Sequence, residues 1–202
     1  MSTVTVVKKN GYVAIAADTL ASYGSLKMSA AYSKTNHKIA IVGRSYLGMT
    51  GWAVSQQVLE HVFRKSGEPP ALANTTEVFE AFQNVHARLK EHYFLVPRAD
   101  PSDPFENSHM HVLIANAYGI FSVGALRTVT ELERFWASGS GTEYALGAMH
   151  ALYETTNDVV SIAEAGVRAA AEFDDATAAP IESYVVRLAG EPVEALDLLL
   201  EA

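Results

Sequence analysis

Residues 2–18 read STVTVVKKNGYVAIAAD, two β-favouring runs on either side of a tight turn. Residues 3–7 and 12–17 are rich in β-branched and apolar side chains, and Asn10-Gly11 between them is a strong predictor of a two-residue hairpin turn. Residues 13–17 are apolar without polar alternation, which is typical of a strand covered on both faces. The sequence therefore predicts a chain that opens with a hairpin buried between two layers.

The pattern of the remaining chain predicts an α+β protein built as a four-layer αββα sandwich. Further strands are expected at 38–42, 46–50, 111–115, 120–123 and 183–188, with an extended segment at 135–141. Helical spacing of apolar residues predicts one helix that starts near Gly51, a second opened by residues 75–77, and two more at 142–153 and 159–173. Because each element needs its apolar face covered, this order favours two stacked sheets with helix layers outside.

The chain length fits one domain. It has 202 residues and a mass of 21.8 kDa, so residues 1–202 are interpreted as a single domain with an acidic C-terminal tail at 190–202. Residues 191–201 have the pattern of a short amphipathic helix. The proline-dense segment 96–105 is expected to be a surface loop rather than a linker.

Composition excludes several classes of function. Hydrophobic residues make up 49% and charged residues 19%, and no apolar run approaches the roughly 20 residues of a membrane helix. A net charge of −8 and a pI near 5.3 oppose a nucleic-acid partner. There are no cysteines, so disulfides and a cysteine nucleophile are excluded, which is compatible with the cytoplasm. The N-terminus lacks a secretory signal, so the chain is expected to start at its working N-terminus.

Neither a metal nor a cofactor is expected. The seven histidines are dispersed, and His109 and His111 alternate along a predicted strand without a third ligand nearby. The glycines form no phosphate-binding motif.

Ser2 is the first candidate for chemistry. A small residue after the initiator methionine is what methionine aminopeptidase leaves exposed, so removal of Met1 would give an N-terminal serine. Its α-amine, with a reference pKa near 8, can accept the proton of its own hydroxyl. Nucleophile and base would then belong to one residue. The alternative is that Ser2 is simply a small residue tolerated after the initiator methionine, without a catalytic role.

The stretch from Ser2 to Asp18 resembles the start of proteasome β subunits and HslV, which are N-terminal-nucleophile peptidases. With Ser2 as first residue, Asp18 matches without gaps the aspartate that orients an essential lysine in that family; a start at Thr3 would lose this register. The resemblance implies a lysine that lowers the pKa of the nucleophile, for which Lys38 and Lys34 both remain candidates. Lys38 is favoured because, within His37-Lys38-Ile39-Ala40-Ile41, it resembles the lysine at the entry of an apolar strand in that family, although the ungapped register selects Lys34.

Later motifs extend the resemblance to about residue 188, and the most similar branch of the family is the proteobacterial single-subunit proteasome homologue. The resemblance implies that the N–H of Gly51 donates a hydrogen bond to the oxyanion. It also implies that Ser140, within Gly139-Ser140-Gly141, lies beside the α-amine. Asp174 and Thr177 would be the family's later aspartate and hydroxyl. The implied substrate-binding residues are Ala21, Ser22, Met49 and Ala53. Main-chain groups of Ser22 and Ala53 would hold the substrate as an added strand, and Ala21, Met49 and Ala53 would line a small apolar pocket. The chain departs from the family in having serine where threonine is usual, and a retained Met1 would block the α-amine.

The resemblance implies a self-compartmentalising peptidase. Its substrates would be unfolded polypeptides, its assembly a double ring of identical subunits, and its partner an ATP-driven unfoldase; six or seven subunits per ring are both open. A small-molecule amidase on the same fold and a catalytically silent ring scaffold are the alternatives. The latter would have no use for Asp18 and Asp174.

Overall fold

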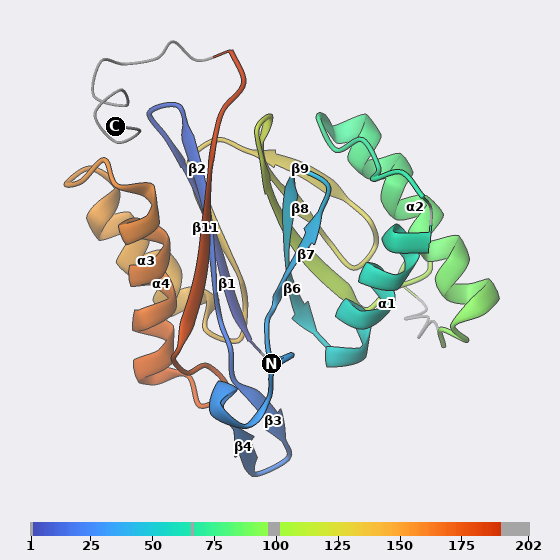
Figure 1. The fold of residues 1–202 in the computed structure, drawn as a ribbon, viewed down its shortest axis with the longest axis horizontal. Helices are drawn as coiled ribbons and strands as arrows, with labels where there is room; N and C mark the ends of the chain where they lie inside the picture. The colour runs from blue at the N-terminus through green and yellow to red at the C-terminus, as the bar shows by residue number, and fades with distance from the viewer. Residues whose placement is uncertain (1, 66, 97–101, 191–202) are drawn as a thin grey trace.

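The computed structural model describes residues 2–65, 67–96 and 102–190, and these form four layers (Figure 1). Helices α3 (Thr142–Tyr153) and α4 (Val159–Phe173) cover one sheet, and α1 (Ala53–Lys65) and α2 (Thr75–His92) cover the other. The predicted αββα sandwich is confirmed.

The first sheet has four strands in the order β10-β1-β2-β11. Its strands are β1 (Thr3–Lys9), β2 (Tyr12–Asp18), β10 (Phe135–Gly139) and β11 (Ile181–Arg187). The β1–β2 hairpin turns at Asn10 and Gly11, whose φ angles of 48° and 78° are both positive, as a type I′ turn requires. All neighbours in this sheet are antiparallel.

The second sheet has five strands in the order β5-β6-β7-β8-β9. Its strands are β5 (Ile39–Val42), β6 (Ser45–Gly51), β7 (Met110–Asn116), β8 (Gly119–Val123) and β9 (Val129–Leu132). A separate hairpin, β3 (Ala21–Tyr23) with β4 (Leu26–Met28), and a short 3-10 helix, η1 (Ala30–Tyr32), connect the two sheets.

Side-chain alternation along β1 and β2 builds the two buried layers around the first sheet. Val7 and Ala14 pack toward α3 and α4, whereas Val4 and Ile15 pack between the sheets. A third core lies between the second sheet and helices α1 and α2. The prediction that β2 is covered on both faces is therefore confirmed.

Four elements, α1, β3, β4 and β9, differ from the sequence-based expectations. Helix α1 starts at Ala53 because β6 continues through Gly51. The short strands β3, β4 and β9 were not predicted; their residues are largely exposed, so they lack the apolar runs on which strand prediction depends. The predicted tail helix at 191–201 lies outside the described residues, as does part of the predicted loop at 96–105.

Two helices, α2 and α4, start with side-chain caps that local chemistry favours. Asn74 accepts a hydrogen bond from the backbone N–H of Glu77 at the start of α2. Asp158 does the same for Val160 and Ser161 at the start of α4. None of the helices in the described ranges is both long and apolar enough to cross a membrane.

Candidate active site

The Asp18 carboxylate, at the end of β2, is fully buried and organises the surrounding main chain. Oδ1 accepts the backbone N–H of Thr3 at 2.9 Å. Oδ2 accepts the N–H of Leu20 at 3.0 Å and that of Ala178 at 3.4 Å. A buried carboxylate needs such donors, because removing it from water without partners costs several kcal/mol.

Lys38 completes the partners of this carboxylate. Its Nζ lies 2.6 Å from Asp18 Oδ2, and its side chain is 11% exposed. Burial lowers the pKa of Lys38, while the Asp18 carboxylate opposes that shift by its charge and hydrogen bond. Lys34, the rival candidate, is exposed in the turn after η1. The structure thus pairs Asp18 with Lys38.

Ser2 is buried, and its main chain is held where β1 meets β10. The Ser2 carbonyl oxygen accepts the N–H of Ser140 at 3.0 Å. Gly139, which pairs with Thr3, has a φ of 110°, and a Cβ added there would overlap the Ser2 carbonyl. Glycine at 139 therefore permits the close approach that fixes the start of the chain.

Ser140, Asp174 and Thr177 form one hydrogen-bonded network with Thr3. Asp174 Oδ2 accepts from Ser140 Oγ at 2.7 Å and from Thr177 Oγ1 at 2.5 Å. Thr3 Oγ1 lies 2.6 Å from Thr177 Oγ1. Since Thr177 gives its one proton to Asp174, Thr3 must be the donor to Thr177. The network extends from the C-terminal end of α4 to the first residues of β1.

Gly51 is the last residue of β6, exposed and with a φ of 121°. Its neighbour Thr50 contacts the first sheet, since Thr50 Oγ1 lies 2.9 Å from Ser138 Oγ of β10. The ends of β6 and β10 are therefore joined by a hydrogen bond across the two sheets.

The predicted substrate-binding residues lie on three elements. Ala21 and Ser22 are on β3, Met49 is on β6, and Ala53 is the first residue of α1. Met49 is buried in the core beneath α1 and α2, whereas Ser22 and Ala53 are exposed. The small apolar pocket that these residues were expected to line stays a prediction.

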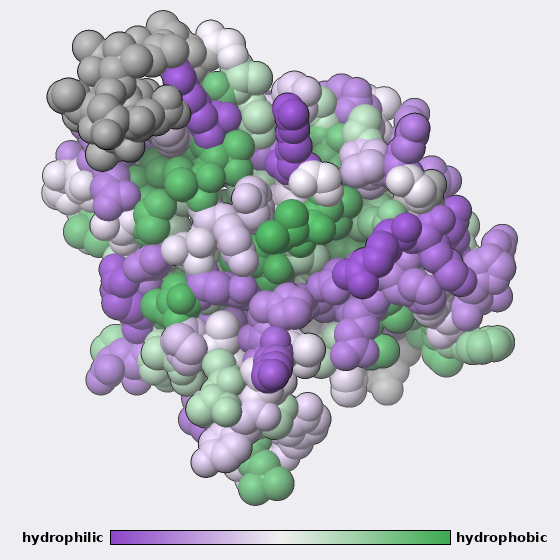
Figure 2. Space-filling view, in the orientation of Figure 1, coloured by the Kyte–Doolittle hydropathy of each residue, from purple (hydrophilic) through white to green (hydrophobic). Residues whose placement is uncertain are grey.

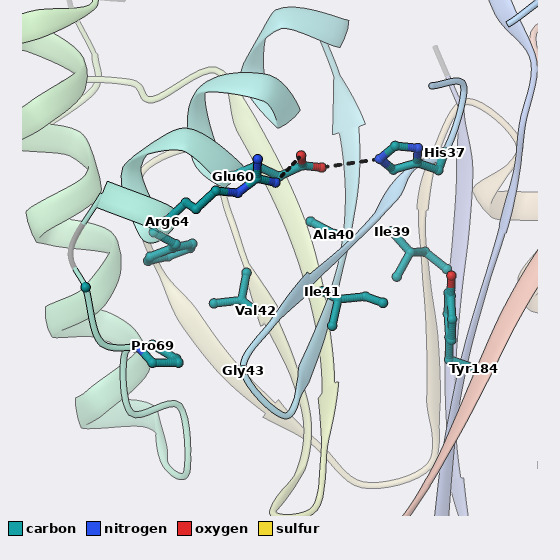
Figure 3. Close-up of a pocket in the computed structure, with 12 residues that line it drawn as sticks. His37, Ile39, Ala40, Ile41, Val42, Gly43, Glu60, Arg64, Pro69 and Tyr184 are labelled. Atoms are coloured by element: carbon teal, nitrogen blue, oxygen red, sulfur yellow. Dashed lines mark ion pairs between the residues drawn. The ribbon is translucent and has the colours of Figure 1, made fainter. Parts of the chain in front are cut away.

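A hollow of about 590 Å³ lies outside this cluster, along β5 (Figure 3). His37 and Glu60 face each other at its rim, with 3.6 Å between Nε2 and Oε1. Tyr184 of β11 lines the end of the hollow away from α1. None of the predicted site residues lines this hollow, so the chemistry proposed from the sequence does not occur there.

Two residues near the ion pair were missed by the sequence analysis. Glu182 of β11 accepts the backbone N–H groups of Lys38 at 2.5 Å and Ile39 at 3.1 Å. Thr3, considered only as a rival first residue, donates to both Asp18 and Thr177. In the sequence, Glu182 is only a single acidic residue at the start of a predicted strand. That pattern does not indicate which backbone groups its carboxylate binds. Among the described residues, no group of three or more His, Cys, Asp or Glu side chains could hold a metal ion.

The chain matches one known protein family over most of its length. The profile of the proteasome subunit family matches residues 1–186. The chain belongs to the proteasome subunit family. The sequence-based resemblance to proteasome β subunits and HslV is thereby confirmed, and the family supports a peptidase of the N-terminal-nucleophile type.

Solved proteasome-like structures agree with this assignment. BPH of Thiobacillus denitrificans is 46% identical with a TM-score of 0.88, over 93% of this chain and 99% of that one. A structure of the same BPH in complex with epoxomicin is 45% identical with a TM-score of 0.87, over the same shares of the two chains. HslV from Trypanosoma brucei shares the fold, with 18% identity and a TM-score of 0.65 over 92% of this chain and 99% of that one. No curated protein matches the chain.

Proposed function

We propose that this proteasome-family chain is a self-compartmentalising endopeptidase that hydrolyses peptide bonds of unfolded polypeptides, with Ser2 as its nucleophile after removal of Met1. One observation carries the proposal. The carboxylate of Asp18 binds both the ammonium of Lys38 and the backbone N–H of Thr3, next to Ser2. A cation is thereby tied to the residue adjacent to the proposed nucleophile, in a site largely removed from water.

The reaction follows from the roles given to these groups. Ser2 Oγ attacks the carbonyl carbon of the scissile bond, and the Ser2 α-amine takes the hydroxyl proton. The negative charge that develops on the carbonyl oxygen is stabilised by the N–H of Gly51. The α-amine then protonates the departing amine, which leaves an ester on Ser2. Water hydrolyses that ester, and the serine is regenerated.

Two further contributions support this chemistry: the charge of Lys38, and a hydrogen-bond network that holds the reacting residue in one orientation. Lys38 would favour the ionised form of the Ser2 hydroxyl through its charge. The network of Ser140, Asp174 and Thr177 would orient the α-amine, since Ser140 binds Ser2 through the main chain and Asp174 through its hydroxyl. Such fixed positions reduce the entropic part of the barrier.

Assembly into a ring is part of the proposal, and exposed apolar side chains support it. The edge strands β5 and β11 face the viewer in Figure 1, and Figure 2 has apolar surface on the same face. Ile41 on β5 is 60% exposed and Val185 on β11 is 51% exposed. Large apolar side chains exposed on one face are a feature of surfaces that bind other proteins. We infer a double ring of identical subunits that encloses the sites and receives substrate from an ATP-driven unfoldase.

The test compares wild type with Ser2→Ala and Ser2→Thr on fluorogenic peptides. Ser2→Ala should lower kcat by more than about 1000-fold, because it removes the nucleophile but still permits methionine removal. Ser2→Thr should stay active, and Ser33→Ala, in the loop after η1, should match wild type. We also expect epoxomicin, which is bound to BPH in a solved structure, to inhibit hydrolysis.

Intact mass and light scattering separate the alternatives. An active protein that retains Met1 would contradict the α-amine as base. A ring that has lost Met1 but hydrolyses nothing would indicate a silent scaffold. A monomer or dimer active only on small amides would indicate an amidase.

A further inference from the structure

Glu182 connects the edges of the two sheets at the residue that carries the site's cation. Its carboxylate Oε1 accepts the N–H of Lys38 at 2.5 Å and the N–H of Ile39 at 3.1 Å. β11 is the edge strand of the first sheet, and β5, which starts at Ile39, is the edge strand of the second. An edge strand has unpaired backbone N–H groups. Here a side chain from the other sheet binds the first N–H of β5 and the N–H of the residue before it.

The main chain of Lys38 is held on both sides. Glu182 accepts its N–H, and its carbonyl oxygen accepts the N–H of Met49 in β6 at 3.0 Å. The same stretch of β11 also aligns the partner of the lysine, since Ile181 pairs with Asp18 in the β2–β11 ladder. Two adjacent residues of one strand therefore set the backbone positions of both members of the ion pair.

We propose that Glu182 is a positioning residue for the peptidase reaction, which keeps the Lys38 ammonium on Asp18 by anchoring the backbone from which Lys38 extends. The proposal rests on the proposed function. Glu182 touches neither Ser2 nor Gly51 in any hydrogen bond of the described residues, so it acts through Lys38. The outer partners that orient metal ligands are worth about 10- to 100-fold in affinity or activity, and we take the same order of effect for Glu182.

The charge of Glu182 matters in addition to its hydrogen bonds. Three carboxylates, those of Asp18, Glu182 and Asp174, raise the pKa of Lys38 against the larger lowering caused by burial. Burial raises the pKa of Glu182 itself, whereas its two backbone donors and the nearby His37 and Lys38 lower it. Loss of the Glu182 charge should therefore make the Lys38 ammonium easier to deprotonate.

Glu182→Gln and Glu182→Ala separate the two contributions. Gln keeps an oxygen that accepts both N–H groups but lacks the charge, so kcat near neutral pH should stay close to wild type. The basic limb of its pH profile should move to lower pH. Ala loses the anchor as well, so kcat should fall about 10- to 100-fold with little change in KM.

Ser183→Ala is the matched control on the next residue of β11. Ser183 Oγ donates to Glu164 Oε1 at 2.7 Å, and alternation along the strand directs it to the other face. This variant loses a hydrogen bond of the same strand without touching Lys38, and it should leave kcat and the pH profile unchanged.

A second readout does not require activity. The rate at which an amine-selective reagent labels Lys38, followed by peptide mass spectrometry across pH in the Ser2→Ala background, reports the titration of Lys38. Lys34, in its exposed turn, is an internal reference for the reagent. Glu182→Gln should shift the Lys38 titration to lower pH through the lost charge alone. Glu182→Ala should in addition raise the labelling rate of Lys38 relative to Lys34 across the pH range, because the unanchored ammonium leaves Asp18. An alanine variant whose Lys38 is labelled like that of Glu182→Gln would overturn the proposal. If the wild type hydrolyses no peptide, the proposed function fails, and the labelling still decides the role of Glu182.

Discussion

Lys38 Nζ lies 2.6 Å from Asp18 Oδ2, although Asp18 ends a strand of the first sheet and Lys38 precedes a strand of the second. The pair is nearly dry, with the carboxylate fully buried and the lysine side chain 11% exposed. An ion pair removed from water gains strong attraction but loses the hydration of both charges. Its placement beside the start of the chain suits a functional role better than a purely stabilising one.

Removal of one partner of this pair should destabilise the protein. Lys38→Met leaves the Asp18 carboxylate buried without its cation, and the expected loss is about 3–5 kcal/mol in the free energy of unfolding. The double variant Asp18→Asn with Lys38→Met should lose less than the sum of the single variants, because neither charge remains. Denaturant unfolding at one fixed protein concentration measures all three, since assembly contributes to apparent stability.

Lys8→Met provides the comparison for that prediction. Lys8 Nζ lies 3.5 Å from Glu133, whose side chain is 83% exposed, so water already screens this pair and its loss should have little effect. Equal unfolding midpoints for Lys38→Met and wild type would contradict a stabilising contact between Lys38 and Asp18.

A methyl group at Gly139 should displace Ser2. The alanine Cβ would overlap the Ser2 carbonyl oxygen, and a φ of 110° is strained for any residue with a side chain. We expect Gly139→Ala to lower the free energy of unfolding by at least about 1–3 kcal/mol and to lower kcat as well. Thermal melting and peptide hydrolysis measure the two effects.

Gly147→Ala is the same kind of substitution at a position where we expect the opposite effect on stability. Gly147 lies inside α3, and a Cβ there would meet nothing within 4 Å. Alanine should stabilise the helix by about 0.5–1 kcal/mol without affecting kcat. If Gly139→Ala also raised the stability and left kcat unchanged, the close approach of β10 to Ser2 would not be required for activity.

The pH profile of kcat/KM should have two limbs with different origins. Activity should rise as the Ser2 α-amine loses its proton, near its reference pKa of about 8. It should fall when Lys38 deprotonates, and this limb should lie below the ordinary lysine pKa of 10.5 because burial lowers the pKa of Lys38. Steady-state hydrolysis between pH 6 and about 10.5 measures both limbs.

Lys38→Arg tests the assignment of the basic limb. Arginine stays protonated throughout this range, so the variant should be slower but should lack the decline at high pH. An unchanged decline would assign the limb to another group.

The order of the layers and the opening hairpin follow from the amino-acid sequence. Asn10-Gly11 favours a turn with two positive φ angles wherever it occurs between strands, and the structure has that turn. Residues 13–17, apolar on both faces, can only be satisfied between two layers, and β2 lies there. Such features depend on neighbouring residues and on hydrophobic period, so they can be derived without coordinates.

The lysine that binds Asp18 could be assigned only from the three-dimensional structure. Lys34 and Lys38 lie four residues apart, and their separation from Asp18 depends on the path of the chain through β3, β4 and η1. Those elements are short and exposed, so local propensity gives no firm prediction for them. The contacts of Glu182 with Lys38 and of Gly139 with Ser2 span more than a hundred residues of sequence. The first arises because the two sheets pack against each other, and the second because β10 pairs with β1 within one sheet. Both arrangements are properties of the whole core rather than of any one segment.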